Sequence, residues 1–202
     1  MALLDEIIEA ATDDKASLGT LLRKCLILEN QSPNSRFKAW LDKELDGYGE
    51  DDELPTYRVF IAGSYGIFVG MVQQLNNQPL PLHILTPEDR KLLDPMKLRQ
   101  PAASYEGLDK TTDAQLPWPP VLTVKYQRKF YEGGDLILNR AWQLIPGSML
   151  VALQEQVRTR VLRFALELKK ELGSRSLDQL PRETVETSVE KHIFAGKLID
   201  WT

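Results

Sequence analysis

Cysteine and histidine are scarce in this chain of 202 residues, which has one cysteine, Cys25, and two histidines, His83 and His192. A lone cysteine cannot form an internal disulfide, which fits a reducing compartment. The usual Cys/His zinc site cannot be built from one cysteine and two histidines that lie far apart in the sequence. The sequence therefore predicts no metal site, and no motif in it indicates a cofactor.

Long apolar runs and targeting signals are also missing. No apolar stretch approaches the roughly 20 residues that a membrane helix needs. The N-terminal segment carries Asp5, Glu6 and Glu9 and has no basic region, unlike a signal peptide. We expect a cytoplasmic protein without a membrane partner.

Positive charge is not in excess, because 25 Lys and Arg against 29 Asp and Glu give a net charge of −4. Phosphate binding depends on positive charge, so the composition disfavours a dedicated nucleic-acid binder. Two basic segments keep this alternative open, and they contain Lys125, Arg128 and Lys129, and Arg158, Arg160, Arg163, Lys169 and Lys170. Aromatic residues interleave the first segment and could stack on bases: Tyr126, Phe130 and Tyr131. We favour solvated faces with ion pairs four residues apart.

A complete catalytic motif is missing too. Ala62–Gly66 resembles the nucleophile elbow G-x-S-x-G, with alanine in place of the first glycine. A serine nucleophile needs a histidine base and a carboxylate, and an elbow runs into a helix. Here Ile67–Gly70 has the composition of a strand, so we interpret Gly63-Ser64 as a hairpin turn. We predict no catalytic residue, and a serine hydrolase built around Ser64 is the alternative.

Helical periodicity dominates the first third of the chain. Apolar residues from Leu3 to Ala11 predict one helix, and Ser17 can cap a second. Asn34 can cap a third helix, which Gly47 ends. Further along, the longest apolar stripe predicts a helix over 147–172. We expect Trp40 and Phe164 to be buried, because they lie on the apolar stripes of their helices.

The middle of the chain has the composition of a β-sheet. Tyr57–Ile61 and Tyr65–Val69 are rich in β-branched and aromatic residues and predict a hairpin, and residues 136–145 predict a further strand. Thr86 can cap a short helix that starts at Pro87. The predicted fold is α+β: N-terminal helices and one long C-terminal helix pack on a small, mostly antiparallel sheet.

The predicted domain covers residues 1–173, and residues 174–202 form a tail or a partner-dependent segment. The tail is mostly polar, and its isolated apolar residues include Ile193, Phe194, Leu198, Ile199 and Trp201. Such a segment can bury its apolar residues in a partner or on its own domain, and the sequence leaves both open.

Several segments in order resemble the AbiTii domain, which is named after a component of a lactococcal abortive-infection system. They are Leu3–Ile8, Leu21–Leu26, Gly47–Arg58, Pro117–Pro120 and Ala141–Leu172. The resemblance covers residues 2–172. It implies bacterial phage defence, in which the infected cell stops growing or dies, and it supplies no catalytic residue. Relatives often continue into a segment rich in small residues and asparagine, or into a further domain. Residues 174–202 do not resemble either, so we expect no fused effector.

The predicted function is binding or regulation in phage defence, through a protein partner or a homo-oligomer. The acidic run Glu50–Glu53 lacks the ligand spacing of an EF-hand and favours a solvated loop between a helix and a strand. Candidate partner-binding residues are Asp51, Asp52, Glu53, Tyr57, Arg58 and Trp118, with Ile193, Phe194, Leu198 and Trp201 in the tail. For Trp118, burial in the core is the favoured alternative.

Overall fold

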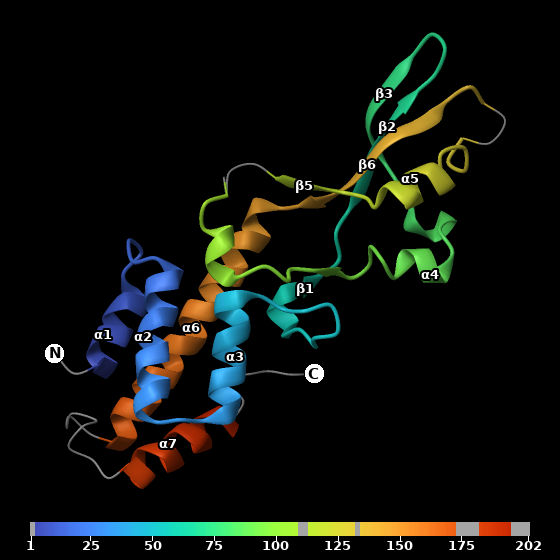
Figure 1. The fold of residues 1–202 in the computed structure, drawn as a ribbon. Helices are drawn as coiled ribbons and strands as arrows, with labels where there is room; N and C mark the ends of the chain where they lie inside the picture. The colour runs from blue at the N-terminus through green and yellow to red at the C-terminus, as the bar shows by residue number, and fades with distance from the viewer. Residues whose placement is uncertain (1–2, 109–112, 132–133, 173–181, 195–202) are drawn as a thin grey trace. The chain divides into compact units, whose positions relative to one another are not determined.

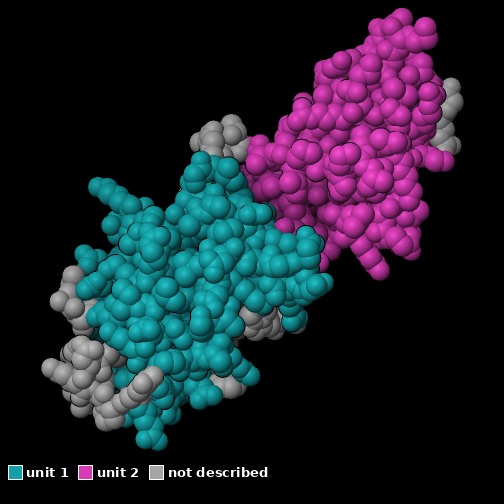
Figure 2. Space-filling model, viewed as in Figure 1, with its two compact units in different colours: residues 1–58, 98–108, 150–202 teal, residues 59–97, 109–149 magenta. Residues whose placement is uncertain are grey.

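The computed structural model describes residues 3–108, 113–131, 134–172 and 182–194 of the chain (Figure 1). The chain divides into two compact units, coloured separately in Figure 2. Unit 1 contains residues 1–58, 98–108 and 150–202, and unit 2 contains residues 59–97 and 109–149. The chain therefore leaves unit 1 and returns to it twice.

Unit 1 is helical. Its helices are α1 (Leu3–Thr12), α2 (Leu18–Gln31), α3 (Ser35–Asp46), α7 (Arg182–Phe194) and, from Leu150 onwards, α6 (Gly147–Leu172). The predicted caps are confirmed: the side chain of Ser17 accepts a hydrogen bond from Thr20 N, and that of Asn34 accepts from Phe37 N. Gly47 ends α3 with a φ of 98°, which favours glycine.

The core of unit 1 forms where α3 meets α6. The ring of Phe37 lies 5.1 Å from that of Phe164 and 6.3 Å from that of Trp40, centroid to centroid. All three side chains are buried, which confirms the burial predicted for Trp40 and Phe164. Substantial burial of aromatic area of this kind is a main source of stability in a small unit.

Unit 2 is built on an antiparallel sheet with the strand order β3-β2-β6-β5. These strands are β2 (Ser64–Val69), β3 (Gln74–Pro79), β5 (Ala114–Pro117) and β6 (Ile137–Ile145). A second, two-stranded sheet pairs β1 (Val59–Phe60) with β4 (Met96–Lys97). Unit 2 also contains the short helices α4 (Pro87–Arg90) and α5 (Pro120–Lys125) and the 3-10 turn Leu82–Ile84, whereas the 3-10 turns Thr56–Arg58 and Ala102–Tyr105 belong to unit 1. The expected α+β class is confirmed.

The predicted hairpin is wrong in its pairing. β1 pairs with β4, while β2 forms its hairpin with β3 through a turn at Gly70–Gln73. Ser64 is therefore the first residue of a strand and not part of a turn. The cause lies upstream, because Tyr57 and Arg58 belong to a 3-10 turn and leave only two residues for β1.

Helix α7 lies within the segment that the sequence analysis describes as a tail. Val185 and Val189 are buried, and Glu171 of α6 accepts hydrogen bonds from the three α7 residues Ser188, Lys191 and His192. Apolar periodicity did not predict this helix, because it has few buried apolar residues. The backbone of Ile193 and Phe194 ends α7, whereas Leu198, Ile199 and Trp201 lie outside the described residues. A partner contact by these residues stays a prediction.

Among the residues with a described structure, no helix combines the length and the apolar character that are needed to cross a bilayer.

Candidate functional site

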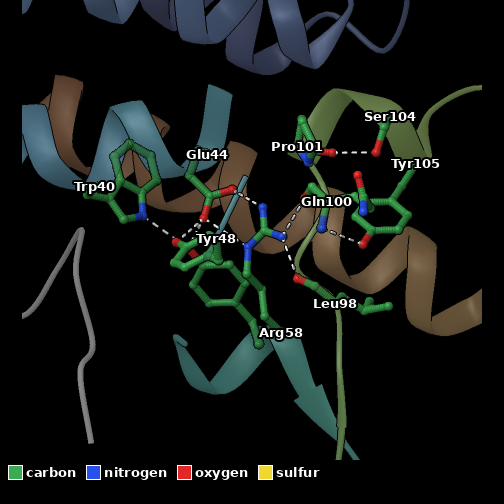
Figure 3. Close-up of polar contacts among 10 residues, drawn as sticks. Trp40, Glu44, Tyr48, Arg58, Leu98, Gln100, Pro101, Ser104 and Tyr105 are labelled. Atoms are coloured by element: carbon green, nitrogen blue, oxygen red, sulfur yellow. Dashed lines mark hydrogen bonds and ion pairs between the residues drawn. The ribbon is translucent and has the colours of Figure 1, made fainter. Parts of the chain in front are cut away.

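A buried ion pair lies in unit 1 between Glu44 of α3 and Arg58 of the first 3-10 turn (Figure 3). Both side chains are 0 % exposed. Arg58 Nη2 lies 2.5 Å from Glu44 Oε2, and Arg58 Nε donates to Glu44 Oε1 at 3.1 Å. The pairing is therefore bidentate, which is the geometry that a guanidinium and a carboxylate prefer.

Two tyrosines complete the coordination of the carboxylate. The hydroxyls of Tyr48 and Tyr57 donate to Glu44 Oε1 at 2.7 and 2.8 Å, and Trp40 Nε1 donates to the Tyr57 hydroxyl at 3.0 Å. Burial, and then the negative charge of Glu44, raise the pKa of both phenols above the ordinary value. Both phenols therefore remain donors at neutral pH.

The remaining donors of Arg58 are directed at the backbone. Its Nη1 donates to the carbonyl oxygens of Leu98 at 2.7 Å and Gln100 at 2.9 Å, and its guanidinium lies 4.6 Å from the centroid of the Tyr48 ring. Burial lowers the pKa of Arg58, but the hydrogen bonds and charge of Glu44 outweigh it and raise that pKa overall. Arg58 is thus a structural cation with a fully buried side chain.

Sequence analysis missed Glu44, although a signal for it was present. Phe37, Trp40 and Leu41 define the apolar stripe of α3, and Glu44 continues this stripe at helical spacing. A carboxylate at such a position becomes buried, and a buried charge requires a partner. The sequence cannot show which of the many cations supplies it.

The acidic loop, residues 47–54, follows α3 and is closed by its own hydrogen bonds. Asp52 accepts from Gly49 N at 2.8 Å and pairs with Lys43 Nζ at 2.9 Å, which lowers the pKa of Asp52. The guanidinium of Arg99 donates to the carbonyl oxygens of Gly49, Glu50 and Asp52. The loop is consequently preformed.

The acidic residues of this loop differ in their contacts and exposure. Asp52 serves the loop itself, whereas Glu50, Asp51 and Glu53 are exposed. A divalent cation prefers carbonyl and carboxylate oxygens together, but here the carbonyls already accept from Arg99. No cluster of three or more metal-binding side chains occurs in the described ranges.

The serine alternative receives no support from the geometry around Ser64. This side chain is 5 % exposed, and its hydroxyl accepts a hydrogen bond from Trp118 Nε1 at 3.3 Å. Trp118 is itself buried beside Phe130, so it belongs to the core of unit 2. The buried Cys25 offers no nucleophile either, because burial raises the pKa of its thiol to about 12.

The basic segments are partly engaged in structural contacts. Lys125 pairs with Asp89 at 2.5 Å. Arg158 donates to the carbonyl oxygens of Ala10 and Ala16, and it pairs with Glu106. These partners support the interpretation of the basic residues as structural and solvated.

Comparison with known proteins identifies the family. The AbiTii family model matches residues 2–193, nearly the whole chain. The chain belongs to the AbiTii family, which links it to abortive-infection phage defence. The match extends past the predicted limit at residue 172 and includes most of α7. Neither the curated proteins nor the solved structures contain a significant match to the chain.

Proposed function

We propose that the protein acts in phage defence by binding a protein partner through the β2–β3 hairpin of unit 2. The observation that carries this proposal is the exposure of two adjacent apolar residues at the hairpin turn. Met71 is 91 % exposed and Val72 is 92 % exposed. The turn protrudes at one end of unit 2 (Figure 1). Adjacent apolar side chains at a protruding turn are suited to enter a pocket of a partner.

The hairpin also lacks charge. No Asp, Glu, Lys or Arg occurs between Arg58 and Glu88. Depletion of charged residues characterises the centre of protein–protein interfaces, and methionine is enriched there. A surface of this kind has no cation with which to bind phosphate, which favours protein over nucleic acid at this position.

The turn is held in a defined conformation. Gly70 N donates to Gln73 O at 2.9 Å, and Met71 N donates to Asp135 Oδ2 at 3.0 Å. A Cβ atom at position 70 would lie 2.8 Å from the same carboxylate oxygen, so a larger residue there would displace the Asp135 side chain. A preformed turn reduces the entropy that binding would cost.

The sheet edges of unit 2 are poorly suited to pairing with a strand of a partner. The β2–β3 pairing is interrupted by a bulge, where Asn77 has a φ of 52°, and β3 ends at Pro79. The other edge strand, β5, has four residues and ends at Pro117. Bulges, prolines and short strands discourage edge-to-edge pairing. The hairpin turn is therefore the better contact.

The test is phage protection by cells that express the chain in its natural genetic context. The double variant M71D/V72D should lose protection while its thermal melting matches the wild type, because both side chains are exposed. The matched control is L92D, which places a charge at another exposed apolar residue of unit 2 and should protect normally. Full protection by M71D/V72D would refute the proposal.

A further inference from the structure

A second surface of unit 2 is a stripe of exposed apolar and basic side chains along residues 121–129. Val121, Val124 and Lys125 lie on α5 at spacings of three and four, so they share one side of the helix. Arg128 and Lys129 are exposed in the turns that follow α5, where Lys129 N donates to Tyr126 O. Leu122 and Tyr126 face the core.

The stripe is apolar at its start and cationic at its end. Val121 is 67 % exposed and Val124 is 71 % exposed. Between Asp113 and Glu132 the sequence contains no acidic residue, and its charged residues are Lys125, Arg128 and Lys129. We call Val121, Val124, Arg128 and Lys129 the apolar–basic face. Its composition fits a protein surface that carries carboxylates.

Of the three aromatic residues of this segment, Tyr131 alone is exposed, at 37 %. Tyr126 is buried, and its hydroxyl donates to Asp89 Oδ2. The rings of Phe130 and Tyr131 both contact Phe68 edge-on, at centroid distances of 5.9 and 4.7 Å. Non-specific binding of single strands relies on exposed aromatic platforms, so a protein partner is the better fit.

The chain itself carries the complementary surface. Unit 1 has 22 acidic and 17 basic residues, a net charge of −5, whereas unit 2 has 7 acidic and 8 basic residues, a net charge of +1. In unit 1 the acidic loop exposes Glu50, Asp51 and Glu53 on a backbone that Arg99 holds in place. Preformed, oppositely charged surfaces favour association of two copies.

We infer that the apolar–basic face of one copy binds the acidic loop of a second copy. The two surfaces differ, so each copy still offers one unused surface after a contact forms. The contact is therefore heterologous, and it builds head-to-tail chains unless the rotation closes a ring. This inference goes beyond the proposed function, because the hairpin turn plays no part in it.

The experiment exchanges charges between the two surfaces. The face variant R128E/K129E and the loop variant E50K/D51K/E53K each repel themselves, so each should remain monomeric at concentrations where the wild type associates. An equimolar mixture of the two variants restores opposite charges at both kinds of contact and should associate again. Sedimentation velocity over a dilution series separates association between copies from contacts within one chain.

A matched control changes the same charge elsewhere. R163E/K170E reverses two exposed basic residues of α6 and should associate as the wild type does. Association of the wild type should also weaken at least tenfold when the salt concentration is raised well above the physiological level, because exposed charges are screened.

Three results would overturn the inference. One is a wild type that stays monomeric at tens of micromolar, and another is a mixture of the two variants that does not associate. The third is a monomer in every sample together with binding to generic duplex DNA that R128E/K129E abolishes. That result would assign the face to nucleic acid. Normal self-association by M71D/V72D would show that this contact and the proposed hairpin contact are separate.

Discussion

The ion pair of Glu44 and Arg58 allows a quantitative prediction, because both side chains are fully buried. Glu44→Gln keeps the shape of the side chain and leaves the guanidinium without a counter-charge. Breaking a buried pair in this way costs about 3–5 kcal/mol. For a chain of this length, such a loss lowers the melting temperature by roughly 6–20 °C. We expect a similar loss for Arg58→Met, which strands the carboxylate.

The double variant E44Q/R58M should be far less unstable than the two single losses together predict. Both charges are then absent, and the remaining cost comes from the hydrogen bonds to Tyr48, Tyr57 and the carbonyls of Leu98 and Gln100. We expect a coupling free energy of about 2 kcal/mol or more, near the upper end for residues in direct contact.

The assay is urea unfolding of the four proteins in the cycle, followed by circular dichroism and by hydrogen exchange of the α3 amides. The exchange data assign the effect to unit 1. Asp42→Asn on the same helix is the control, because it removes an exposed ion pair with Lys38 at 2.7 Å. Its cost should be a small fraction of that of E44Q, because exposed ion pairs contribute little to stability. If E44Q were no less stable than D42N, or if the two losses were additive, the reasoning about burial would be wrong.

Two further predictions concern alkaline stability and Ser64. Because the folded-state pKa values of Tyr48 and Tyr57 are raised, their contribution to stability should be complete below about pH 10 and should decline as the pH rises further. Urea unfolding at a series of alkaline pH values should therefore show a steeper decline for the wild type than for Y48F/Y57F. Ser64→Ala should retain phage protection and lose about 1 kcal/mol for the missing hydrogen bond from Trp118. A folded S64A protein without protection would restore the hydrolase alternative.

The helices were predictable because their signals are local. Ser17, Asn34 and Gly47 act on backbone groups within a few residues, so capping and periodicity reveal them without knowledge of the fold. The long helix over 147–172 has a continuous apolar stripe for the same reason. Its bounds agree with the structure.

The strand pairing was not predictable to the same degree. The partner of β1 is β4, almost 40 residues later, and nothing local distinguishes it from β2, which follows at once. The turn at Gly70–Gln73 contains Met71 and Val72 in place of the usual Asn and Gly, so its residue types did not predict a hairpin turn. Apolar residues in a sequence suggest burial, so these two residues did not indicate a turn. Their exposure in the structure is the basis of the proposed contact.

Several distinctive residues of Gly47–Arg58 have structural roles. The sequence predicts Tyr57 and Arg58 as binding residues, and in the structure their side chains hydrogen-bond to the carboxylate of Glu44. Closure of the acidic loop explains Gly49 and Asp52, and satisfaction of a buried charge explains Tyr48, Tyr57 and Arg58. Only Asp51 and Glu53, among the predicted candidates of this segment, remain exposed carboxylates that a partner can contact.

Arg58 lies where the chain passes from unit 1 to unit 2, which explains its structural role. Arg58 is the last residue of unit 1 before the chain first enters unit 2, and Leu98 is the first residue after it returns. The guanidinium donates to the carbonyl of Leu98, and Leu98 N donates to the carbonyl of Arg58 at 2.9 Å. Arg58, held by its ion pair with Glu44, thus joins the segment that leaves unit 1 at Arg58 to the segment that re-enters it at Leu98. A buried, bidentate charge pair suits this task, because it accepts only one geometry and becomes costly when that geometry is lost.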